Sequence, residues 1–209
     1  MSLEKWKGVD MNWGECKLAA LQKMFSAGAV IDTDESTQDY IAAMPFAANE
    51  AIQRILDARP VRKQQEIELE GNPEEQGIDL QDVAYDYKNS GPMEVYTMSD
   101  TGVPRKLYGC RVMAGRYLVV PPLAKATKVL LHYDATVPRI WPNTKDNFPL
   151  PVDEDAAALI PIYIAGELYK DDDNSISTTY MNEFEYGLQM LVPKDTGVIS
   201  NAFTSESGW

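Results

Sequence analysis

Apolar residues recur at helical spacing near the start of the chain. From Trp13 onward they fall about three and four residues apart, which predicts an amphipathic helix. Asn12 precedes this run and Glu15 follows it by three residues, which is the spacing of a capping box. Gly28 stands where the helix should end. The pattern therefore predicts a first helix from Trp13 to the region of Gly28.

A second apolar series with a helical period continues to position 60. Ser36 is expected to cap this helix, and Pro60 is expected to end it. Pro45 interrupts the series, so we expect either a kink or a split at that residue. The first sixty residues then form a pair of helices.

The periodicity changes from helical to alternating between residues 61 and 139. Residues 66–70 alternate strictly, and residues 110–113 and 116–120 on either side of an Ala-Gly pair predict a β-hairpin. Residues 128–134 predict another strand. The expected buried face of that strand carries Val129, Leu131 and Tyr133. Short strands separated by Gly, Pro and Asp turns favour a small antiparallel β-sandwich or barrel.

Proline becomes frequent in residues 140–151, which we expect to be a linker anchored by Trp141 and Phe148. Helical spacing returns at Asp153, and a bend is expected at Pro161 because it lies too far along for the first turn. The acidic stretch 171–174 should break this helix.

Ser175 is expected to cap the last helix, which follows that acidic break. The apolar stripe of this helix comprises Ile176, Tyr180, Phe184, Leu188 and Leu191. The order helices, strands, helices predicts an α+β protein. Residues 1–60 and 152–192 would form a helical bundle, residues 61–139 an inserted β domain, and residues 193–209 a polar tail.

Charge and composition limit the classes of function. The 209-residue chain has a formal net charge of −13, whereas nucleic-acid binding proteins gain affinity from basic side chains, so we expect no sequence-specific nucleic-acid binding. An acidic surface suits either plain solubility or a channel that DNA passes without sticking. No apolar run reaches the roughly 20 residues of a membrane helix. Cys16 and Cys110 match no metal spacing and are expected to be free thiols.

Few residues of the chain are candidates for catalysis or metal binding. His132 is the single histidine of the chain, and the run 171–174 lacks the alternating spacing and glycine of a calcium loop. Glu183 and Glu185 stand two apart, so on a helix they face different directions. We therefore expect no catalytic site, metal or cofactor, and an enzyme with a novel site is the remote alternative.

Two stretches of the C-terminal helices resemble a known family. The first is Pro161-Ile162-Tyr163-Ile164-Ala165, and the second, after the acidic break, is Tyr180-x-x-x-Phe184-Glu185. Together they are similar to the C-terminal helical hairpin of tailed-bacteriophage head–tail adaptor proteins, also called connector or head completion proteins. The β insert between two helical parts is similar to the arrangement in podovirus tail-tube adaptors.

The resemblance implies a virion structural protein that is assembled in the bacterial host cytoplasm. Such adaptors form a ring below the portal, extend the DNA channel, and offer a platform for tail or stopper proteins. Phe203 and Trp209 are candidate interaction residues, because a tail can order on a neighbour through aromatic anchors. The other interpretation is a disordered terminus with incidental aromatic residues.

A rival hypothesis assigns the function to the β domain. Tyr85, Tyr87, Tyr96 and Tyr117 could stack on sugar rings or contact another protein, which would make the domain a carbohydrate- or protein-binding module. The same tyrosines could instead fill the core. A row of exposed tyrosines on one sheet face would favour the binding module, and burial of all four would weaken it.

Overall fold

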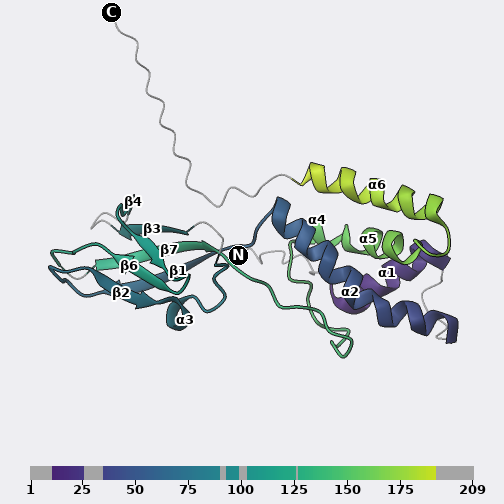
Figure 1. The fold of residues 1–209 in the computed structure, drawn as a ribbon, viewed down its shortest axis with the longest axis horizontal. Coiled ribbons are helices and arrows are strands. Elements are labelled where there is room, and N and C mark those ends of the chain that lie inside the picture. Colours follow the sequence, from purple (N-terminus) through teal and green to yellow (C-terminus); the bar gives the residue numbers. More distant parts are fainter. Residues whose placement is uncertain (1–10, 26–34, 90–92, 99–102, 126, 192–209) are drawn as a thin grey trace, which may run out of the picture.

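Most of the helices lie at one end of an elongated molecule and the strands at the other (Figure 1). The computed structural model describes residues 11–25, 35–89, 93–98, 103–125 and 127–191. The helices are α1 (Trp13–Phe25), α2 (Glu35–Ala58), α3 (Leu80–Val83), α4 (Glu154–Ala157), α5 (Ile160–Leu168) and α6 (Asn174–Met190). The strands are β1 (Arg62–Leu69), β2 (Gln76–Asp79), β3 (Met93–Met98), β4 (Pro104–Lys106), β5 (Arg111–Met113), β6 (Tyr117–Val120) and β7 (Thr127–Asp134).

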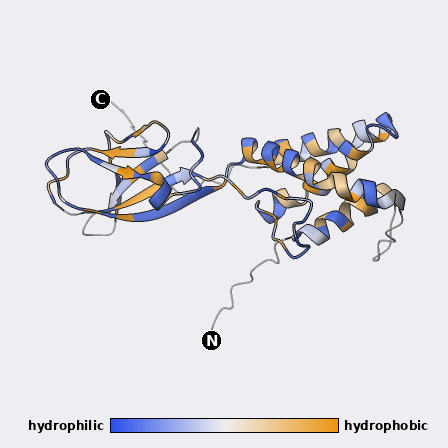
Figure 2. Ribbon diagram, turned by 60° about the horizontal axis from the view of Figure 1, so that its bottom comes forward, coloured by the Kyte–Doolittle hydropathy of each residue, from blue (hydrophilic) through white to orange (hydrophobic). Residues whose placement is uncertain are grey.

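The protein is α+β with two antiparallel sheets, as the order of patterns predicted. We call α1, α2, α4, α5 and α6 the helical half, and β1 to β7 with α3 the sheet half. Hydrophobic residues lie in both halves, and each half has its own core (Figure 2). The domain boundaries expected from the sequence stay predictions.

Helix α5 lies at the centre of the helical half. It packs against α1, α2 and α6, and its residues 160–166 are all buried. A helix that is apolar on every side must be surrounded, which explains this position. Gly166 allows α6 to come close, because a Cβ at this glycine would lie only 3.2 Å from the Cβ of Tyr180.

The two N-terminal helices agree with those predicted from the sequence, with two differences. The capping box is confirmed, since Asn12 N–H donates to Glu15 Oε2 and Glu15 N–H donates to Asn12 Oδ1, each at 2.9 Å. Helix α2 begins at Glu35, one residue before the expected cap, and runs unbroken through Pro45, so a split there is wrong. Gly28 lies outside the described residues. Burial of Met44, Ala47 and Ala48 around the proline holds the two parts of α2 on one core.

The sheets are ordered β1-β7-β3-β4 and β2-β6-β5. The predicted hairpin is confirmed as β5 and β6, joined through Ala114 at φ 52° and Gly115 at φ 64°. The predicted face of β7 is confirmed by the burial of Val129, Leu131 and Tyr133. Residues of β1, β3, β6, β7 and α3 share one core, so both sheets contribute to it. The short elements β2, α3 and β4 had no periodic signal in the sequence.

The chain after residue 152 corrects three expectations. Helix α4 ends at Ala157 and a new helix begins at Ile160, so Pro161 lies in a first turn and causes no bend within a helix. The cap of α6 is Asp173 and not Ser175, because the Asp173 carboxylate accepts from Ser175 N–H at 2.8 Å and from Ile176 N–H at 3.2 Å. Ile176 is 39% exposed and lies off the buried stripe, which centres on Phe184 and Ser177.

Candidate docking surface between the helices and the sheets

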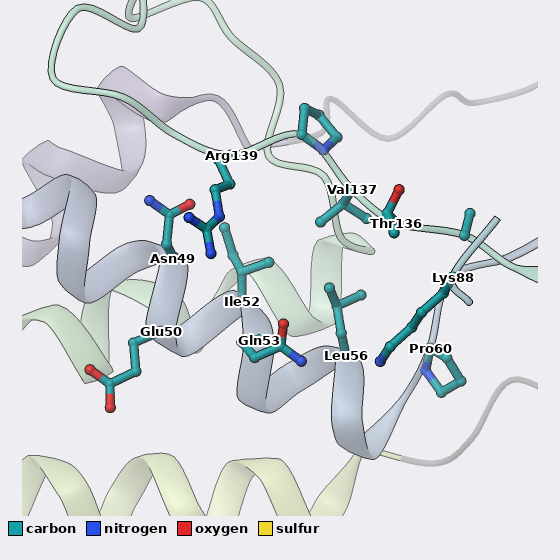
Figure 3. A pocket seen from close by; sticks show the side chains of 12 residues that line it. Asn49, Glu50, Ile52, Gln53, Leu56, Pro60, Lys88, Thr136, Val137 and Arg139 are labelled. Atoms are coloured by element: carbon teal, nitrogen blue, oxygen red, sulfur yellow. The ribbon is translucent and has the colours of Figure 1, made fainter. Parts of the chain in front are cut away.

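A pocket of about 430 Å³ lies where α2 meets residues 135–139, which leave strand β7 (Figure 3). Its apolar lining includes Ile52, Leu56 and Val137, while Asn49, Gln53 and Lys88 supply polar groups. Lys88 comes from the sheet half, and its Nζ lies 3.7 Å from a carboxylate oxygen of Asp57 on α2. The pocket therefore has both apolar and polar lining residues, and they come from both halves.

A second, more open depression of about 850 Å³ lies along residues 138–149. Pro138 and Arg139 line both depressions, so the two adjoin at this pair of residues. Trp141, Lys145 and Phe148 lie along the second depression. We call these two adjoining depressions together the junction groove.

Asn49 fixes one end of the loop that forms the junction groove. Its side-chain nitrogen donates to the carbonyl oxygen of Ile140 and to that of Pro45, each at 2.7 Å. Its side-chain oxygen accepts from Ile140 N–H at 2.9 Å. One side chain of α2 thus satisfies both backbone groups of Ile140, whose own side chain is buried in the helical core.

The other end of the loop is held at the start of α1. Phe148 accepts a hydrogen bond from Trp13 N–H at 2.8 Å, and Leu150 donates to the carbonyl oxygen of Met11 at 3.0 Å. Lys17 forms an ion pair with Asp146 at 2.7 Å. Residues 140–150 are therefore attached to the helical half at both ends.

The expected anchors of this segment are only half correct. Phe148 packs partly buried against the helical core, but Trp141 is 59% exposed, so its assignment as an anchor is wrong. Ile140 and Leu150 take the anchoring positions and are both buried. Trp141 stays exposed because Ile140 beside it takes the core position, while Trp141 N–H donates to Thr144 Oγ1 at 2.7 Å in a tight turn.

The junction groove carries cations without acidic partners. Basic side chains such as Lys17, Arg54 and Lys88 form ion pairs. Arg139 and Lys145 form no ion pair with any residue that the structure describes. Glu50 also lines the groove, but its side chain points away from Arg139 (Figure 3).

Glu50 instead serves the helical half. Burial raises the pKa of the Tyr163 hydroxyl, and a hydrogen bond with Glu50 raises it further. This carboxylate is engaged by α5, which leaves the cationic character of the groove to Arg139 and Lys145. The arrangement of exposed indole, guanidinium and ammonium groups is suited to binding and offers no nucleophile paired with a base.

The residues that the sequence offered as candidates for catalysis or metal binding take part in contacts within the fold. His132 meets Tyr96 edge to face, with ring centroids 5.2 Å apart. In the acidic break, Asp172 accepts from the Tyr40 hydroxyl and Asp173 caps α6. Among the described residues, no group of three or more His, Cys, Asp or Glu side chains is placed to hold a metal ion.

The two glutamates of α6 are also engaged. Glu183 lies 3.9 Å from Lys23 Nζ, and Glu185 forms an ion pair with Arg54. The buried thiol of Cys16 has its pKa raised to about 12 by burial, so it stays protonated. The two glutamates therefore join α6 to α1 and α2, and the Cys16 thiol lies in the helical core.

The four tyrosines of the rival hypothesis do not form one row. Tyr85 is 85% exposed in the turn after α3 and Tyr117 is 43% exposed on β6, whereas Tyr96 is buried on β3. Tyr87 is partly buried and meets Tyr133 edge to face. Two of the four can therefore be reached by a ligand, and they belong to different elements.

Phe203 and Trp209 lie outside the described residues. Within the described part of the chain, no helix has both the length and the apolar character needed to cross a membrane. Comparison with protein-family models and with curated proteins found no match to this chain.

The junction groove was not predicted from the sequence. Its one sequence signal is Trp141, which stands between the basic residues Arg139 and Lys145 in a proline-rich segment.

Proposed function

We propose that the chain is a non-enzymatic virion structural protein, a head–tail adaptor that forms a ring below the portal of a tailed phage and extends its DNA channel. Its partners would be the portal and the tail or stopper proteins, and it would assemble in the bacterial host cytoplasm. In this proposal the helical half is a bundle and the sheet half is a β-sandwich inserted into it.

The observation that supports this proposal is the packing of the α5–α6 hairpin. Tyr163 belongs to the first motif stretch and Phe184 to the second, and their rings meet edge to face with centroids 4.8 Å apart. Both side chains are buried in the core that α1 and α2 complete. Two residues of the stretches that carry the family resemblance therefore lie in the core shared by the helices before and after the strands.

The shape of the molecule is compatible with ring assembly. A ring subunit needs two different surfaces, because each copy contacts its neighbours head to tail. The helical and sheet halves lie at opposite ends of an elongated molecule and differ in structure (Figure 1). Each half can therefore offer a surface that the other does not repeat.

Affinity capture tests the proposal directly. The tagged full-length chain would be isolated from a host lysate after prophage induction, its partners identified by mass spectrometry, and the complex viewed by electron microscopy. We expect a portal-like ring protein and a ring of this chain seated on it. Recovery of glycans or surface proteins without any virion component would refute the adaptor and support the rival binding module.

A truncated chain serves as the matched control. Removal of residues 194–209 should leave the described fold intact, since all the elements from α1 to α6 end before them. If the tail is an assembly element, this variant melts like the full chain and fails to form the ring. Unchanged ring formation would remove the tail, with Phe203 and Trp209, from the assembly role while leaving the adaptor itself in place.

A further inference from the structure

We propose that the junction groove binds an extended acidic segment of a partner protein. Carboxylates of that segment pair with Arg139 and Lys145, and one of its apolar side chains packs on Trp141. This inference concerns the groove alone and does not depend on the adaptor assignment.

Charge complementarity identifies the occupant. In a chain of net charge −13, the exposed Arg139 and Lys145 lack acidic partners among the residues that the structure describes. Guanidinium groups bind carboxylates through two parallel hydrogen bonds, so a free arginine at a groove favours an acidic ligand. The indole of Trp141, 59% exposed beside them, adds the kind of aromatic contact that dominates binding energies.

The loop is already held in one conformation before a ligand arrives. Asn49 fixes Ile140, Trp13 and Met11 fix residues 148–150, and the Trp141–Thr144 turn closes the tip. The segment 138–151 contains four prolines and no glycine, which further restricts the backbone. Binding therefore loses little conformational entropy, which is the condition for an exposed aromatic residue to act as an anchor.

The two depressions of the groove favour an extended ligand that carries both carboxylates and apolar side chains. Trp141 lies along one of these depressions, Ile52 and Leu56 line the other, and Arg139 lines both. An extended segment can place carboxylates against Arg139 and Lys145 and an apolar side chain in this pocket. A compact ligand would occupy only one of the two depressions.

A nucleic acid is the less suitable occupant. Arg139 and Lys145 together neutralise few phosphates, and nucleic-acid affinity grows with the number of phosphates neutralised. Asp146 lies beside Lys145 in the same loop, and the chain as a whole repels polyanions. A protein segment with a few carboxylates and apolar residues meets less repulsion.

The experiment uses the full-length chain as bait for a random peptide library displayed on phage. We expect enriched peptides to combine Asp or Glu with an aromatic or large aliphatic residue. Trp141→Ala and the double variant Arg139→Glu/Lys145→Glu should each weaken binding of a synthetic enriched peptide about tenfold or more. Thermal melting of each variant, measured alongside, should match that of the unsubstituted chain.

Matched controls come from the sheet half. Tyr108→Ala removes an aromatic side chain that is 78% exposed, and Arg105→Glu reverses an exposed basic residue, both away from the groove. Both should leave peptide binding unchanged. Enrichment of peptides without acidic residues, or equal loss of binding in the control variants, overturns the proposal. Binding of an oligothymidine that Trp141→Ala abolishes, without peptide enrichment, also overturns it and assigns the groove to nucleic acid.

Discussion

The ring of Tyr163 on α5 meets the ring of Phe184 on α6 edge to face, with centroids 4.8 Å apart. Arg54 of α2 lies over the Phe184 ring at 5.4 Å from its centroid and forms an ion pair with Glu185. Helix α2, which is distant in sequence, therefore meets the consecutive helices α5 and α6 at one aromatic pair. The contacts of Arg54 link a helix that precedes the strands to two that follow them.

Replacement of Phe184 tests whether this contact holds the helical half together. Phe184→Ala leaves a cavity at a fully buried position and should lower the free energy of unfolding by about 3–5 kcal/mol. Tyr186→Ala, two residues further along the same helix at a side chain that is 63% exposed, should change it by less than about 0.5 kcal/mol. Urea denaturation followed by circular dichroism measures both, and equal midpoints for the two variants would contradict the packing described.

The helical half was largely predictable because its apolar residues recur every three or four positions. The exact starts of helices were less predictable. In the acidic break, Asp171, Asp172, Asp173 and Ser175 are all residue types that cap helices, and only the backbone conformation selects among them. Asp173 has extended φ and ψ angles of −147° and 100°, which place its carboxylate at the first free N–H groups of α6.

A pair of alanine substitutions distinguishes the two possible caps. Asp173→Ala removes the acceptor of two backbone N–H groups and should cost about 1 kcal/mol of stability. Ser175→Ala should be nearly neutral, because the serine donates only its backbone N–H to that cap. Thermal unfolding of the two variants decides the point, and a larger loss for Ser175→Ala would restore the assignment made from the sequence.

The candidate site could not be predicted in the same way. Asn49 and Ile140 are 91 positions apart, and no periodic pattern connects a helix residue with a loop residue across such a distance. Periodicity reports which face of an element is buried, but not which loop lies on it. Trp141 was expected to anchor the proline-rich linker, whereas the smaller Ile140 beside it is buried instead.

The Asn49 contact makes a separate prediction. Asn49→Ala leaves the N–H and C=O of Ile140 without their partner and should destabilise the protein by about 2 kcal/mol or more. Hydrogen exchange at the Ile140 amide should accelerate, because that N–H loses its acceptor. Gln53→Ala is the control, since Gln53 lines the same pocket but bonds only to Asp57 of its own helix. Similar exchange rates in both variants would show that Asn49 does not fix the loop.

In the sheet half, the side chain of Asp86 bonds to two other residues, as Asn49 does in the helical half. The residue is 9% exposed, and its carboxylate accepts from the Tyr133 hydroxyl at 2.9 Å and pairs with Lys63. Burial by itself raises the pKa of Asp86, but the bonds from Lys63 and Tyr133 outweigh burial and hold the pKa below the ordinary value of 3.8. The folded protein therefore prefers the charged carboxylate.

The sign of the resulting pH dependence follows from this lowered pKa. The stabilisation is complete above the unfolded pKa and is lost as the pH falls through the lower folded pKa. Asp86→Asn should cost about 2 kcal/mol at pH 7, and its difference from the unsubstituted chain should shrink below about pH 4. Asp82→Asn, at an exposed carboxylate of α3, should show no such trend. Urea midpoints at pH 7, 5 and 3 measure the difference, and a gap that stays constant to pH 3 would mean that the charge of Asp86 does not stabilise the sheets.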